Sequence, residues 1–152
     1  MKTKHRRQAA AKRIVRDELT VYRTVGMNNK EMLTKDEQLA CTVPLGKSWE
    51  LIKAGHGTGV DLKALSDAVS ICVMASEDID PFLEDISESA AKAVCEVGDR
   101  CARTGRIGVD YAALRDIPPA LEFYKELLGT ATSGQLFTWM QAVLQAREGV
   151  AA

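Results

Sequence analysis

Apolar residues recur at helical spacing over most of the chain, and this pattern predicts an all-α protein. The apolar stripe is widest over residues 60–77, where it covers more than one face, so we expect a central, largely buried helix there. A second stripe follows Asp80 and Pro81, a pair that favours a helix start, and extends to about Thr104. No useful length of alternating apolar and polar residues predicts a strand. We therefore expect a single-domain bundle of five or six helices.

Capping residues and glycines predict where the other helices begin and end. Residues 34–37 and residues 132–135 both have the spacing of a capping box, in which two side chains bond to free backbone amides. They open helices that we expect to end near Ala54 and before Gly149. Gly105 is suited to end the helix of the second stripe.

Prolines lie inside two of the predicted helices. Pro44 removes one backbone hydrogen bond and crowds the preceding turn, so we expect a kink or a break near Val43. Asp110 predicts the start of a short helix, which the adjacent Pro118 and Pro119 must either kink or restart.

The N-terminal region differs in charge from the rest of the chain. The first 16 residues carry a local charge of +7 with no acid, whereas the remaining chain has 13 basic and 21 acidic residues, a charge of −8. We interpret residues 1–13 as a mobile basic arm and residues 14–149 as the helical domain. A short helix is expected directly after the arm, and it carries Ile14, Val15, Leu19 and Tyr22.

Composition and cysteine usage indicate a soluble protein of a reducing compartment. Of the 152 residues, 46% are hydrophobic and 27% are charged. No segment approaches the roughly 18 uninterrupted apolar residues that indicate a membrane span. The four cysteines include no CxxC pair, and no apolar stretch follows the N-terminal charges as it would in a signal peptide. We therefore expect a cytoplasmic protein that contacts no membrane.

The glycine-rich stretch KAGHGTGVD, residues 53–61, raises the question of a phosphate-binding loop. It contains neither GxxxxGKS/T nor a GxGxxG turn after a strand, the two patterns that bind nucleotide phosphates. Gly55 stands where a helix end needs a residue of positive φ, and Thr58 or Asp61 stands where the next helix needs a cap. We therefore interpret the stretch as a turn. His56 leaves a second interpretation open, in which an anion binds backbone amides at the following helix start.

Residues of catalytic or metal chemistry form no recognisable pattern. His5 and His56 are the only histidines, and they do not form a pair at ligand spacing. We interpret Cys72, Cys95 and Cys101 as small, buried hydrophobic residues. Because no nucleophile and base pair and no cofactor loop can be assembled, we expect a protein that is not an enzyme and uses no metal or cofactor.

An acidic cluster follows the widest apolar stripe and continues into the next predicted helix. Its members are Glu77, Asp78, Asp80, Glu84, Asp85 and Glu88. The spacing of a calcium-binding loop is absent. In one interpretation these carboxylates interact favourably with the positive end of the helix macrodipole and keep the exposed side of the helix solvated. In the other they form a surface that docks a basic partner or mimics a nucleic-acid backbone.

Three arginines mark the opposite end of the same predicted helix. Arg100, Arg103 and Arg106 stand at i, i+3 and i+6, where they complement the negative end of the macrodipole. The alternative is a phosphate-binding face shared with the basic residues of the arm, which are Lys2, Lys4, Arg6, Arg7, Lys12 and Arg13. The arm has no interleaved aromatic residues for base stacking.

Three stretches of the chain carry a resemblance: GHGTGVDLKALSDAVSICVMASE, GDRCARTGRIGVDYAALRDI and LEFYKELLGTATSGQLFTWM. Their order resembles that of small helical accessory proteins encoded on bacterial phages and plasmids. The landmarks are a glycine turn after one helix and an arginine-glycine turn before an aspartate. In this chain they are formed by Gly55, Gly57 and Thr58 and by Arg103, Gly105, Arg106 and Gly108. The resemblance implies a mobile-element setting and brings no assigned chemistry and no site residue.

We conclude from the sequence that the protein works by binding a macromolecule. The first hypothesis is a non-enzymatic regulator that binds a protein of the host or of the mobile element, as an inhibitor or modulator of that machinery. The alternative is a regulator that binds nucleic acid through the basic arm. The sequence leaves open whether the chain also forms a homo-oligomer.

Overall fold

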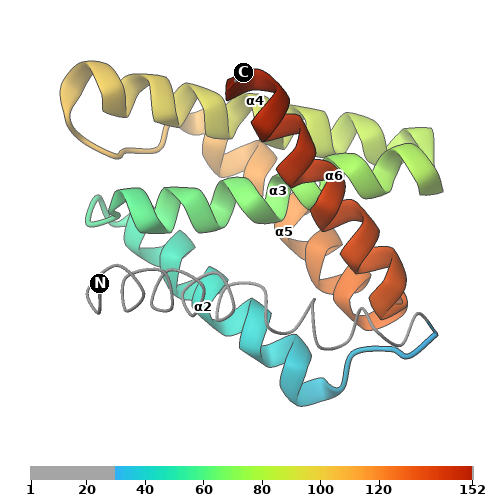
Figure 1. Cartoon of the computed structure of the whole chain (residues 1–152). Helices are drawn as coiled ribbons and strands as arrows, with labels where there is room; N and C mark the ends of the chain where they lie inside the picture. Colours follow the sequence, from blue (N-terminus) through green and yellow to red (C-terminus); the bar gives the residue numbers. More distant parts are fainter. Residues whose placement is uncertain (1–29, 152) are drawn as a thin grey trace, which may run out of the picture.

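The computed structural model describes residues 30–151, and this part of the chain is helical (Figure 1). Its helices are α2 (Lys35–Lys53), α3 (Gly59–Ile79), α4 (Pro81–Thr104), α5 (Tyr111–Thr130) and α6 (Ser133–Ala151). Within this range β-type pairing is limited to an isolated antiparallel bridge between Met32 and Thr132. The predicted all-α fold is therefore confirmed. The basic arm and the short helix expected after it lie outside the described residues.

Helix α3 is the central element, as its wide apolar stripe predicts. It packs against α2, α4, α5 and α6, and Figure 1 shows it running through the middle of the molecule. Leu65, Cys72 and Ala75 on this helix have no exposed surface. Burial of a helix on several sides requires apolar residues beyond a single stripe, which is why the pattern over residues 60–77 is so wide.

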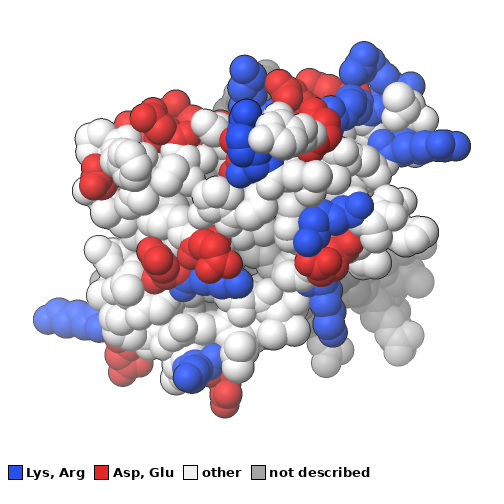
Figure 2. All heavy atoms as spheres, turned by 180° about the vertical axis from the view of Figure 1, so that it is seen from behind, with Lys and Arg blue, Asp and Glu red and all other residues white. Residues whose placement is uncertain are grey.

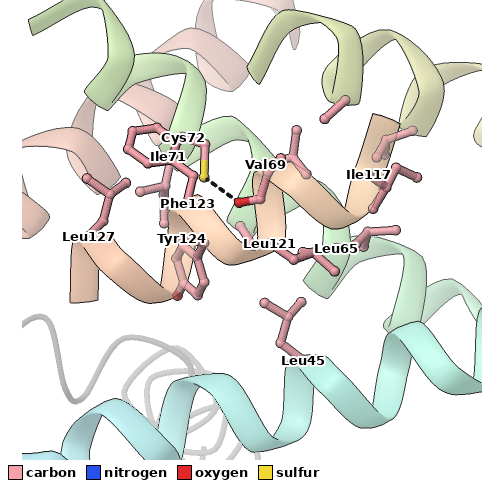
Figure 3. Close-up of a cluster of buried hydrophobic side chains, with 14 of the residues drawn as sticks. Leu45, Leu65, Val69, Ile71, Cys72, Ile117, Leu121, Phe123, Tyr124 and Leu127 are labelled. Atoms are coloured by element: carbon pink, nitrogen blue, oxygen red, sulfur yellow. Dashed lines mark hydrogen bonds between the residues drawn. The ribbon is translucent and has the colours of Figure 1, made fainter. Parts of the chain in front are cut away.

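The hydrophobic core includes residues of all five described helices, and Figure 3 shows the part between α3 and α5, with Leu45 of α2 beside it. Ile117 and Leu121 of α5 pack on the α3 side of this cluster. The thiol of Cys72 donates a hydrogen bond of 3.4 Å to the carbonyl oxygen of Ala120, which links the two helices inside the core. Between residues 30 and 151, no helix combines the length and the apolar content that crossing a lipid bilayer demands.

The predicted helix caps are confirmed in their hydrogen bonds. The amide of Glu37 donates to Thr34 Oγ1 at 3.2 Å while the amide of Thr34 donates to Glu37 Oε1 at 3.0 Å, which is the reciprocal pattern of a capping box. Thr132 and Gln135 repeat this arrangement before α6. Gly105 ends α4 in the left-handed conformation, with a φ of 71°.

The expected proline breaks do not occur. Helix α2 continues through Pro44, and α5 is one 20-residue helix that includes Pro118 and Pro119. Of the predicted alternatives, the break near Val43 and the restart at Pro118 and Pro119 are therefore wrong, and the kinks stay predictions. In α5, tertiary packing accounts for this result, because residues on both sides of the prolines, such as Ile117 and Leu121, are held in the core.

Candidate functional site

The glycine-rich stretch connects α2 to α3 as a turn. Gly55 has a φ of 79°, a conformation that side chains with a Cβ rarely adopt. A Cβ added at Gly57 would lie 2.7 Å from Ile52 Cγ1, so the chain passes too close to this buried residue for a side chain. Both glycines therefore serve the backbone path, and the interpretation of the stretch as a turn is confirmed.

The start of α3 is occupied by a carboxylate of the chain itself. Asp61 accepts a hydrogen bond of 2.8 Å from the Thr58 amide and another of 2.8 Å from the Ser48 hydroxyl. These bonds lower the pKa of Asp61, the Thr58 amide having the largest effect. A fixed negative charge at this position repels a second anion, which disfavours the anion-binding interpretation of the loop around the exposed His56.

The cysteines differ in burial. Burial raises the pKa of the Cys72 thiol to about 12, so this side chain stays protonated as a core residue, in agreement with its prediction. Cys101 is half-buried. The prediction for Cys95 is wrong, because this residue is exposed. Val94 and Val97 face the core, and Cys95 between them points to the other side of α4.

The acidic cluster lies at the junction of α3 and α4, and two of its members already have partners within the protein. Asp80 caps α4 by accepting a hydrogen bond of 2.9 Å from the Phe82 amide. Asp78 accepts a hydrogen bond of 2.8 Å from the indole nitrogen of Trp139 on α6. Glu84 is half-buried, whereas Glu77, Asp85 and Glu88 are exposed. Asp80 therefore acts at the start of α4, as the first interpretation expects, and docking of a partner by the exposed members stays a prediction.

Two large apolar side chains lie exposed among these carboxylates. Ile79 at the end of α3 is 53% exposed, and Phe82 in the first turn of α4 is 71% exposed. Phe82 begins the apolar stripe that was predicted to follow Asp80 and Pro81, yet it is exposed, and the sequence pattern did not single out Ile79. We call five exposed residues of this region the acidic-apolar face: Glu77, Ile79, Phe82, Asp85 and Glu88. Asp78 and Asp80 are exposed too, but they bond within the protein.

A hollow of about 370 Å³ adjoins the acidic-apolar face. Its lining residues come from the end of α3 and the beginning of α6, and they include Asp78, Ile79, Gln135 and Trp139. The hydrogen bond between Trp139 and Asp78 holds the two helices together at this point. The acidic-apolar face therefore lies beside a concave surface lined by both polar and apolar residues.

The arginines at the other end of α4 are not equivalent. Arg100 Nη1 lies 2.5 Å from Asp110 Oδ2, and Arg100 Nη2 donates to the Gly108 carbonyl at 3.4 Å. Arg100 thus joins α4 to the loop before α5, and its hydrogen bond lowers the pKa of Asp110. Arg103 and Arg106 are exposed. The predicted basic face is therefore reduced to these two residues within the described part of α4 and its loop.

An exposed aromatic residue follows the same loop. Tyr111, the first residue of α5, is 78% exposed, and the guanidinium of Arg115 lies 5.7 Å from the centre of its ring. Sequence reasoning missed this pair, although an aromatic residue four positions before an arginine on a helix is a readable signal. Lys2, Lys4, Arg6, Arg7, Lys12 and Arg13 of the predicted binding arm lie outside the described residues.

Figure 2, which views the protein from behind, shows Asp and Glu at the upper left, whereas toward the upper right Lys and Arg lie beside further Asp and Glu residues. Comparison with protein-family models, with curated proteins and with solved structures found no match to this chain. The resemblance to phage and plasmid accessory proteins therefore stays a prediction.

Proposed function

We propose that this protein is a non-enzymatic regulator that binds another protein through its acidic-apolar face. The observation that carries the proposal is the exposure of Phe82 and Ile79, at 71% and 53%, beside three exposed carboxylates. Water contact with a large apolar side chain is unfavourable, and burying it in a partner's pocket recovers that free energy. Exposed apolar groups rimmed by polar residues are typical of interaction sites.

The charge of the face indicates the chemistry of the partner. Glu77, Asp85 and Glu88 would favour a surface with basic residues around an apolar pocket, because complementary charges steer encounter and disfavour wrong partners. Phe82 would supply the central anchor and the charges the rim. We place this partner in the host or mobile-element machinery, as the sequence resemblance implies, and propose that binding inhibits or modulates it.

Affinity capture from the native host tests this proposal. The bait is the full chain, and the lysate is treated with nuclease to remove contacts bridged by nucleic acid. The captured proteins are identified by mass spectrometry. Proteins held by the wild type should be lost with Phe82→Ser and weakened by Asp85→Lys. The control is Tyr111→Ser, which removes a similarly exposed aromatic side chain at the start of α5 and should keep the same proteins. Equal capture by all four chains would contradict the proposal.

The second candidate function, binding of nucleic acid, is favoured by the Tyr111 and Arg115 pair. A ring that is 78% exposed beside a guanidinium offers a stacking platform, and Arg103 and Arg106 lie just before it in the chain. Fluorescence anisotropy with duplex DNA and single-stranded RNA at several salt concentrations is the test. Deletion of residues 1–13 should reduce the salt dependence if the arm contacts phosphates. Tyr111→Ser should weaken binding to single strands, and Phe82→Ser should leave all nucleic-acid binding unchanged.

A further inference from the structure

Helix α2 has a second apolar face, opposite the face that packs on the core. Leu45, Trp49 and Ile52 are buried, with at most 7% exposure. Leu39, Val43 and Leu51 lie on the other side of the helix and are 43–50% exposed. Their separations of four and eight residues place them in one row along the helix, in which the exposed Lys47 stands between Val43 and Leu51. We call these three residues the outer face of α2.

The chain immediately before α2 is fixed in position. Leu33 is buried, with 4% exposure, and the amide of Ser133 donates to the Glu31 carbonyl at 2.7 Å. The bridge between Met32 and Thr132 holds the same segment against the turn between α5 and α6. Whatever precedes Lys30 therefore enters the structure at the N-terminal end of α2, next to the outer face.

The sequence before that point contains a matching apolar stripe. Residues 14–25 lie outside the described residues, and their apolar members Ile14, Val15, Leu19 and Tyr22 have helical spacing. Twelve helical residues span about 18 Å, which equals the length of helix from Leu39 to Leu51. The link after Gly26 is about eight residues long, enough for the chain to turn back along α2 as in an antiparallel helical hairpin.

We propose that residues 14–25 form a helix that docks on the outer face of α2. This contact goes beyond the proposed function, because it involves neither the acidic-apolar face nor the basic end of α4. The physical reason is reciprocal: two apolar stripes, joined by a short link, each lose their contact with water on docking. Docking also fixes where the basic residues 1–13 leave the molecule, at one end of α2.

Hydrogen exchange measured by mass spectrometry on the full chain tests the docking. In the wild type, amides of residues 14–25 should exchange at least ~10-fold more slowly than in a synthetic peptide of residues 1–29. Val43→Glu, on the outer face, should return exchange to the rate of the peptide. Leu19→Glu, on the docking segment, should do the same. The control is Val60→Glu, a substitution at a 77% exposed residue of α3, which should change nothing in residues 14–25.

Two results would overturn the proposal. The first is exchange of residues 14–25 at the peptide rate in the wild type, or protection that Val43→Glu does not remove. The second is protection that depends on protein concentration and accompanies a dimer in analytical ultracentrifugation, because the outer face of α2 would then bind a second copy. Unchanged exchange in α3 verifies that each variant is folded, since the substituted residues of α2 are exposed.

Discussion

The indole nitrogen of Trp139 donates a hydrogen bond of 2.8 Å to Asp78 Oδ2 and thereby joins α6 to the end of α3. The two residues are 61 positions apart in the chain, and Trp139 is buried, with 4% exposure. An indole N–H that is buried needs an acceptor, and Asp78 is the acceptor that the fold provides. This acid therefore stabilises the protein by joining the two helices.

We expect Asp78→Ala to lower the free energy of unfolding by about 1–3 kcal/mol, because the buried indole N–H would lose its acceptor. Urea unfolding followed by tryptophan fluorescence measures this change. Asp85→Ala is the matched control from the same acidic cluster, and as a change at an exposed residue it should stay within about 0.5 kcal/mol. Equal effects of the two substitutions would show that the hydrogen bond to Trp139 does not stabilise the fold.

The turn between α2 and α3 gives a second prediction. Gly57→Ala should destabilise the protein by about 1–3 kcal/mol, because the new Cβ would lie 2.7 Å from Ile52 Cγ1 and 3.1 Å from Ile52 Cα. Gly59→Ala is the control, since nothing lies within 4 Å of a Cβ at this position and its φ is not positive. It should leave stability unchanged or raise it by up to about 1 kcal/mol. Thermal unfolding followed by circular dichroism measures the stability of both variants. Equal unfolding temperatures would disprove close packing at Gly57.

The helices were predictable because their signals are local, whereas the candidate sites depend on contacts between distant residues. The capping box of Thr34 and Glu37 spans four residues and is complete in the sequence. The continuity of α5 through Pro118 is set by core packing against other helices, which no local rule contains. In the same way, the bond from Trp139 to Asp78 connects residues that only the folded chain brings together.

Exposure was the property that sequence pattern predicted least well. Phe82 and Cys95 both lie within a helix whose apolar stripe was correctly found. An apolar stripe shows which side of a helix faces the core, but it does not show how far along that side a neighbouring helix packs. Phe82, in the first turn of α4, stays exposed although it belongs to the stripe. The acidic residues were found from composition alone, but which of them are bonded within the protein required the structure.

The ion pair between Arg100 and Asp110 predicts a pH dependence. The hydrogen bond from Arg100 lowers the pKa of Asp110 in the folded protein. A carboxyl whose folded pKa is depressed contributes stability above its unfolded pKa, near 4, and this contribution is lost as the pH falls through the folded pKa. We therefore expect Arg100→Gln to raise the pKa of Asp110 and to reduce the stability lost on acidification below about pH 4.

Carboxyl titration by NMR measures the pKa of Asp110 directly, and urea unfolding at several pH values measures the linked stability. Arg103→Gln is the control, because it removes an equal charge from the same helix at an exposed position. This control should leave the pKa of Asp110 close to that of the wild type. An identical titration curve in Arg100→Gln would rule out the bond as the cause of the depressed pKa.

The cysteines should differ in their reactivity with a maleimide in the native protein. Cys95 is exposed and should be modified first, whereas Cys72 is fully buried and its thiol, with a pKa raised to about 12, should react only as the protein unfolds. Peptide mapping after timed labelling at pH 8 distinguishes the sites. Labelling of Cys72 at the rate of Cys95, without urea, would mean that the contact between α3 and α5 opens readily.

Replacing Pro44 in the middle of α2 should stabilise the protein. Pro44 has no backbone amide, so it cannot donate the helical hydrogen bond to the preceding turn. Its ring is exposed, so replacing it removes no packing from the core. We expect Pro44→Ala to raise the free energy of unfolding by about 1–3 kcal/mol. Pro81→Ala is the control, because Pro81 is the first residue of α4, where the missing amide has no helical partner to lose. Its substitution should have no stabilising effect, and urea unfolding of the two variants should therefore show opposite or clearly different shifts of the midpoint.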